Sequence, residues 1–164
     1  MKTRRATVVL AAMTVLALAL AFALAACGDN GDGEKPAPTA AQTPEATGET
    51  STLDIYSTEW AITGEDGADI PNVAAGEITF ESHNDGQLPH ELAVLKTDLD
   101  AAELPVSAGI VNEAEAGELI GRTAYISGGD SEDLTLTLEA GNYVLFCNIV
   151  AHYEQGTFAP LVVE

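Results

Sequence analysis

Cysteine, histidine and positive charge are all scarce in this sequence. Of its 164 residues, two are cysteine, three are histidine and six are lysine or arginine, against 26 aspartate and glutamate residues. The two cysteines, Cys27 and Cys147, cannot provide a disulfide-rich framework. Any folded part must therefore depend on a hydrophobic core, for which the chain is long enough.

The shortage of positive charge is greatest in residues 51–164, where 21 acidic residues face only Lys96 and Arg122, a net charge of −19. Such a surface repels nucleic acid, which excludes the usual modes of phosphate-backbone binding. It would attract a redox or other protein partner with a basic docking face. The same charge would also keep a protein soluble in a salty environment, and the sequence favours neither explanation.

The first 26 residues have the pattern of a secretory signal peptide. The basic segment MKTRR precedes an uncharged apolar run from Val8 to Ala26. The run ends in Leu24-Ala25-Ala26-Cys27, which resembles the lipobox of bacterial lipoproteins, where cleavage precedes the cysteine and the cysteine carries lipid. An uncleaved membrane helix is the alternative, since about 18 apolar residues can span a bilayer. We expect an exported protein, held by lipid on Cys27 at the outer face of the cytoplasmic membrane or released as a periplasmic or extracellular one.

The composition changes after Cys27. Residues 28–50 contain glycine, proline, threonine, alanine and acidic residues without a hydrophobic period, so they cannot bury a core. The sequence predicts three parts: a lipoprotein signal peptide (1–26), a lipidated Cys27 with a disordered acidic linker (27–50), and one folded domain (51–164).

The domain has a β pattern. Apolar residues alternate with polar ones around Ile78 and Phe80 and from Leu134 to Leu138, and glycine, asparagine and aspartate separate the segments. Several short alternating segments favour an all-β sandwich. Residues 98–118 interrupt the pattern and predict an excursion with one short helix near residues 100–104. We expect three aromatic residues to pack in the core or at its edge: Trp60, Tyr125 and Tyr143.

The segment from Cys147 to His152 contains the residues with metal-binding chemistry. A cysteine ends an apolar strand, and a histidine follows after four residues. Thiolate suits Cu(I) and imidazole suits either copper oxidation state, so a second histidine, His90, would complete a copper-binding set. Singly, these residues have plainer explanations: a buried thiol, a surface histidine and a histidine at a strand end. An exported chain with an unpaired cysteine favours the metal site. His83 falls out of phase with Ile78 and Phe80 and should face solvent.

Two ordered segments resemble the plastocyanin/azurin type of cupredoxin over roughly residues 73–163. The matching positions are Asn84, Gly86, Pro89, His90 and Glu91 in the first segment, and Cys147, Asn148, Ile149, His152, Tyr153 and Gly156 in the second. The resemblance implies a Greek-key β-sandwich, a type 1 (blue) copper cofactor, the ligands His90, Cys147 and His152, and single-electron transfer rather than catalysis.

Thr157 stands where the family has an axial methionine. A β-branched side chain with a hard oxygen should not reach the same point, so we expect the axial slot to be weakly occupied or empty. The Pro89 carbonyl or, less readily, Gln155 could take its place. We also expect a backbone N–H near Glu91 or Asn148 to bind the thiolate, and Asn84 and Asn148 to connect the two ligand loops. An apolar shell of Phe146, Ile149, Val150 and Phe158 should exclude water.

Other functions compete with electron transfer. The same ligands could serve copper delivery or storage, and zinc could occupy them. A multicopper enzyme needs more histidines than His83, His90 and His152 provide. A thiol hydrolase built on Cys147 and His152 lacks an evident oxyanion site.

The lipobox-like segment gives a first testable prediction. Cells supplied with a radioactive fatty acid should label the wild-type protein, because Cys27 becomes the lipidated residue of the mature chain. Cys27→Ser should remove the label and release the protein from the membrane, while Cys147→Ser, which changes the other cysteine, should keep both. A Cys27→Ser protein that stays equally labelled and membrane-bound would contradict the prediction.

Overall fold

The computed structural model describes residues 50–164. The predicted signal peptide, the lipidation at Cys27 and, apart from Thr50, the linker lie outside these residues. Within the described part, no helix is long and apolar enough to cross a membrane. In chain order the elements are β1 (Thr50–Thr58), β2 (Ala61–Thr63), the 3₁₀ helix η1 (Glu65–Gly67), β3 (Gly76–Asn84), β4 (Ala93–Lys96), β5 (Val106–Ser107), β6 (Ile110–Val111), α1 (Glu113–Ala116), β7 (Glu118–Arg122), β8 (Ser131–Leu138), β9 (Gly141–Phe146), α2 (His152–Gln155) and β10 (Phe158–Val163).

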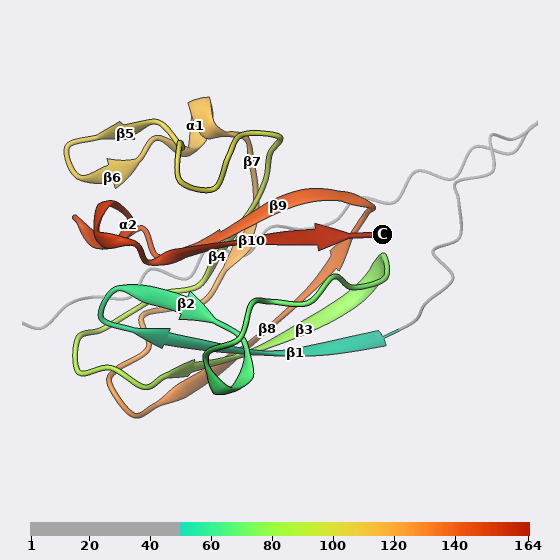
Figure 1. The fold of residues 1–164 in the computed structure, drawn as a ribbon, viewed down its shortest axis with the longest axis horizontal. Helices are drawn as coiled ribbons and strands as arrows, with labels where there is room; N and C mark the ends of the chain where they lie inside the picture. Colours follow the sequence, from blue (N-terminus) through green and yellow to red (C-terminus); the bar gives the residue numbers. More distant parts are fainter. Residues whose placement is uncertain (1–49) are drawn as a thin grey trace, which may run out of the picture. The chain divides into compact units, whose positions relative to one another are not determined.

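Two four-stranded sheets form the β-sandwich that the sequence predicts (Figure 1). One has the order β2-β1-β3-β8, with β1 and β3 parallel, and the other has the order β10-β9-β4-β7, with antiparallel neighbours. Strands β5 and β6 pair separately in the excursion between β4 and β7.

Alternating side chains fill the space between the sheets. In β3 every second residue from Gly76 to Asn84 is buried, because successive side chains of a strand point to opposite faces. The main core cluster takes its buried residues from both sheets: Leu53, Ile55, Ile62, Ile78, Phe80, Leu92, Val94, Leu138, Tyr143, Leu145, Ala159, Leu161 and Val163. Burial of this apolar surface is the main stabilising term for a domain of this size.

A second core cluster lies beneath the excursion. It contains Leu95, Phe146 and Tyr153 together with Leu104 and Val111, both from residues 98–118. The Tyr153 hydroxyl donates to the Ala101 carbonyl (2.8 Å) and accepts the Leu104 N–H (2.9 Å). The excursion is therefore packed and hydrogen-bonded onto the end of the sandwich where α2 lies.

The predicted helix near residues 100–104 is wrong. The Asp100 carboxylate accepts the Ala102 N–H and the Asp100 carbonyl accepts the Glu103 N–H, which forms a turn in place of a helix. The helical segment of the excursion is α1 instead. The chain continues from Leu104 into Pro105, which lacks the N–H that a helix would require.

The three aromatic residues have different environments. Tyr143 is buried in the core, as predicted, and its hydroxyl donates to the Glu139 carbonyl. Tyr125 is 69% exposed, so its predicted packing is wrong, because the neighbouring Ile126 takes the inward position. Trp60 is 47% exposed and lies edge-on to His152.

Candidate metal centre

Three buried side chains with metal-binding atoms meet at one end of the sandwich. His90 precedes β4, Cys147 follows β9, and His152 begins α2. The Nδ1 atoms of His90 and His152 lie 3.4 Å apart, and the Cys147 Sγ lies 3.5 Å from the His152 Nδ1. One donor atom from each residue lies within 4.8 Å of the other two. The structure thus brings together the three residues that the sequence singles out.

Backbone pairing fixes His90. Its N–H donates to the Ile126 carbonyl (3.0 Å), and its carbonyl accepts the Ile126 N–H (2.7 Å). The Asn84 side-chain amide donates to the carbonyls of Leu88 and Ile126 (both 2.8 Å), and its oxygen accepts the Gly86 N–H. Asn84 therefore holds the His90 loop against the segment after β7. The predicted link from Asn84 to the cysteine loop is wrong.

Short-range hydrogen bonds close the loop from Cys147 to Thr157. The Cys147 N–H donates to the Thr157 carbonyl (3.1 Å), and the His152 N–H donates to the Ile149 carbonyl (3.0 Å). Helix α2 ends at Gln155 and is followed by Gly156, whose φ of +114° favours glycine. A Cβ there would lie 2.9 Å from the Trp60 carbonyl oxygen. Glycine thus permits the turn and lets the β1–β2 connection approach the loop.

The sulfur of Cys147 accepts a backbone hydrogen bond from Glu91 at 3.5 Å, as predicted. The Asn148 N–H instead donates to the Glu91 carboxylate (3.2 Å). The Asn148 side chain binds the excursion: its oxygen accepts the Val111 N–H (2.6 Å), and its amide donates to the Glu113 carboxylate (2.7 Å). Residue 91, rather than Asn84, connects the two ligand loops.

Burial disfavours the charged form of each of the three donor side chains. It lowers the pKa of His90 and of His152, and the charge of His152 lowers the pKa of His90 further. Burial raises the pKa of the Cys147 thiol, against the opposing effect of the Glu91 N–H. The Nε2 of His90 has no hydrogen-bond partner among residues 50–164 and can carry the proton of a neutral imidazole whose Nδ1 binds a metal.

Two imidazole nitrogens and one thiol sulfur are a chemically suitable set for a copper ion. The combination of two histidines and one cysteine with a weak or absent axial ligand is the type 1 copper arrangement. A metal cation would replace the thiol proton, since only the thiolate is a ligand. The residues present therefore fit copper.

Thr157 is fully buried beside this group. Its hydroxyl donates to the Glu59 carbonyl at 3.3 Å, so the oxygen is already engaged by the β1–β2 turn. Gln155, the weaker substitute, is exposed. A weakly occupied or empty axial slot at Thr157 stays a prediction.

The predicted apolar shell is only partly correct. Phe146 is buried and Phe158 is half-buried, and both rings contact Tyr153, with centroids 6.4 and 5.0 Å from its own. Ile149 is half-buried, but Val150 is 65% exposed and does not shield the site. Val150 lies in the turn before α2, and its side chain lies beside Gly109 of the excursion.

His83 lies elsewhere, on the outer face of the β2-β1-β3-β8 sheet. Its ring stacks on Tyr56 (centroids 4.8 Å apart) and its Nε2 lies 3.3 Å from the Asp54 carboxylate. It forms a separate group with Asp54 and Glu81. His83 thus lies outside the group of His90 and His152, as the alternation of β3 predicts.

The sequence did not predict two contacts of the site. The rings of Trp60 and His152 meet edge to face with centroids 5.7 Å apart, and Arg122 lies 3.3 Å from the Glu91 carboxylate. No local pattern marks either residue. The one available signal is rarity, because Trp60 is the only tryptophan of the chain and Arg122 is one of two cations after residue 50.

The two-sheet sandwich and its His-Cys-His group define a cupredoxin. The family model of the sulfocyanin (SoxE) domain matches residues 50–164, so the chain belongs to that family.

Several solved structures share this fold. A dithionite-reduced auracyanin from the photosynthetic bacterium Roseiflexus castenholzii is 22% identical, with a TM-score of 0.51 over 71% of this chain and 98% of its own. Auracyanin A, a blue copper protein of Chloroflexus aurantiacus, is 22% identical, with a TM-score of 0.52 over 71% and 100%. Rusticyanin from Thiobacillus ferrooxidans is 14% identical, with a TM-score of 0.52 over 73% and 85%. Comparison with curated protein sequences finds no match.

The environment of Thr157 gives a second testable prediction. Thr157→Val keeps the shape of the side chain and removes the hydroxyl, which already binds the Glu59 carbonyl. The visible spectrum of the copper-loaded domain should stay nearly unchanged, while loss of the hydrogen bond should cost about 1 kcal/mol of unfolding free energy. Thr157→Met should change the spectrum, because a thioether can reach an axial position.

Absorption spectroscopy and thermal unfolding measure these two effects. Thr135→Val is the matched control, since its hydroxyl pairs with Thr79 on the outer face of the other sheet. A strong spectral change in Thr157→Val would make the threonine oxygen a ligand and contradict the prediction.

Proposed function

We propose that this protein carries single electrons through one copper ion bound by His90, Cys147 and His152. The observation that carries the proposal is the convergence of these three buried donors at hydrogen-bonding distance from one another. A bound copper ion supplies a one-electron couple at this site. The chain holds the donors in place, excludes water and donates a backbone N–H from Glu91 to the sulfur.

Rigid support suits an electron carrier. Loops whose backbones are already hydrogen-bonded to Ile126 and Thr157 need little rearrangement when the metal charge changes. Because His90 and Cys147 have no solvent-exposed surface and His152 has only 7%, a bound ion would exchange slowly. This burial favours electron transfer over the alternative of copper delivery or storage, which needs an exchangeable site.

We also propose that the carrier works outside the cytoplasmic membrane with partners that have a basic docking face. The signal-peptide and lipobox patterns of residues 1–27 support the location. The net charge of −19 in residues 51–164 supports the partner. Lys96 and Arg122, the two cations in that part, are both engaged with glutamates, so little positive charge is left to oppose such docking.

Variants of the ligands give a third prediction. Copper-loaded wild-type domain should show an intense visible thiolate-to-copper band. Cys147→Ser should abolish the band, and His90→Ala and His152→Ala should weaken or shift it. His83→Ala, the matched histidine control outside the site, should leave it unchanged. A colourless wild-type domain, or a dependence on His83 equal to that on His90, would refute the proposal.

Repeated oxidation and reduction tests the alternative. The copper content should stay constant through many cycles in the presence of a copper chelator, because the donors are buried. Metal analysis after each cycle measures this. Progressive transfer of copper to the chelator would favour delivery or storage.

The surface charge gives a fourth prediction. Oxidation of the reduced domain by a cationic cobalt(III) complex should slow as salt is added, whereas oxidation by anionic ferricyanide should accelerate, because screening removes attraction in one case and repulsion in the other. Stopped-flow absorbance measures both rates. Equal salt dependence for the two oxidants would mean that the acidic surface does not steer partners to the site.

A further inference from the structure

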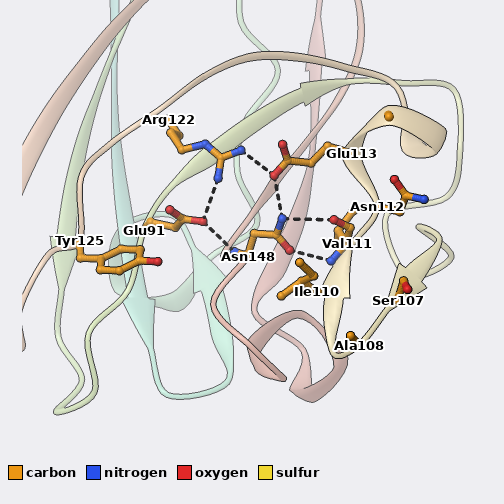
Figure 2. A pocket seen from close by; sticks show the side chains of 11 residues that line it. Glu91, Ser107, Ala108, Ile110, Val111, Asn112, Glu113, Arg122, Tyr125 and Asn148 are labelled. Carbon is orange, nitrogen blue, oxygen red and sulfur yellow. Dashed lines mark hydrogen bonds and ion pairs between the residues drawn. The ribbon is translucent and has the colours of Figure 1, made fainter.

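Arg122 is one of the two cations in the acidic residues 51–164. It ends β7, and its guanidinium lies between two carboxylates: Nη1 is 3.3 Å from Glu91 Oε1 and Nη2 is 2.5 Å from Glu113 Oε1. Figure 2 shows these contacts, with Asn148 beside both carboxylates. These residues line an open groove between the excursion and the sheet.

Glu91 places a buried carboxylate beside the metal site. Glu91 is only 5% exposed, and a buried carboxylate is costly unless it is paired and hydrogen-bonded. Its two partners are Arg122 and the Asn148 N–H. Its own N–H donates to the Cys147 sulfur. A negative charge thus lies one residue from His90, in contact with the residue that follows Cys147.

Glu113 completes the connection from the other side. One of its oxygens accepts both the Arg122 guanidinium and the Asn148 side-chain amide (2.7 Å). Asn148 also makes two hydrogen bonds with the backbone of Val111, at 2.6 and 3.2 Å. Arg122 therefore holds together one carboxylate from the His90 loop, one from the excursion and, through both, the backbone and side chain of Asn148.

We propose that Arg122 is a positioning residue of the metal centre, which fixes the two ligand loops relative to each other and offsets the negative charge of Glu91 beside the Cys147 thiolate. The effect on the potential rests on the proposed electron-carrier function, whereas the positioning does not. Because Cu(II) carries one more positive charge than Cu(I), an unbalanced carboxylate nearby favours the oxidised form. Arg122 consequently raises the reduction potential.

The chain offers a matched control for this role. Lys96 pairs with Glu139 at 2.9 Å, in the same sheet but at the other end of β4. Glu139 is exposed, and within residues 50–164 the Lys96 ammonium donates to Glu139 and not to a residue of the ligand loops. Lys96→Gln and Arg122→Gln change the net charge by the same amount, so a difference between them reports local interactions.

The first experiment measures reduction potentials of the copper-loaded variants. Arg122→Gln should lower the potential, so that the Cu(II) to Cu(I) ratio at a fixed solution potential rises about tenfold. Glu91→Gln, which removes the charge and keeps the shape, should raise the potential. Lys96→Gln and Glu139→Gln should shift it little. The proposed charge effect is overturned if Arg122→Gln shifts the potential no more than Lys96→Gln does, and Glu91→Gln no more than Glu139→Gln does.

The second experiment uses the metal-free domain and amide hydrogen exchange followed by NMR. Arg122→Gln should speed exchange of the Asn148 N–H, which loses a fixed acceptor in Glu91, while Lys96→Gln should leave it unchanged. The amides of Phe80 and Leu145 in the core report whether the fold is intact. Unaltered exchange at Asn148 in an intact Arg122→Gln domain overturns the positioning role. Since this readout needs no copper, it separates failure of this inference from failure of the proposed function.

Discussion

The pairing of Ala93 with Phe146 in the antiparallel β4–β9 ladder is the constraint on which the metal centre depends. It places the residues before β4 and the residues after β9 at the same end of one sheet. His90 and Cys147 are thereby neighbours although 57 positions separate them in sequence. A register shift of one residue would turn the side chains of a strand to the opposite face, and the core residues Val94 and Leu145 hold the register through their burial.

The sequence predicts this site well because its information is local. Cys147 and His152 belong to one short loop, and their chemical types together suggest a metal. The alternation around Phe80 predicts a sandwich and also separates His83 from the site. The predictions that fail concern loops. Asp100 forms a turn because its own side chain binds the backbone, and Val150 is exposed because it lies in a turn of the ligand loop. Neither result follows from hydrophobic periodicity.

The missed interactions are all long-range. Arg122 meets Glu91 only after β7 has paired with β4, with Ala93 opposite Arg122, and Glu113 approaches them only when the excursion has packed on Tyr153. An arginine followed by threonine has no sequence signature for such a role. The network also explains how a strongly acidic domain can bury Glu91: one of its two cations is placed where desolvation of a carboxylate would otherwise be most costly.

The two sheets contribute differently to the centre. His90 and Cys147 lie beside the ends of β4 and β9 in the β10-β9-β4-β7 sheet, and α2 in the β9–β10 connection provides His152. The turn between β1 and β2 of the other sheet contacts this group. Glu59 accepts the Thr157 hydroxyl through its carbonyl and the Gln87 N–H through its carboxylate, so it contacts both ligand loops. Trp60, the next residue, places its ring against His152 and exposes about half of its surface. Since His152 itself is nearly buried, the indole of Trp60 presents more surface to solvent than any of the three donor side chains does.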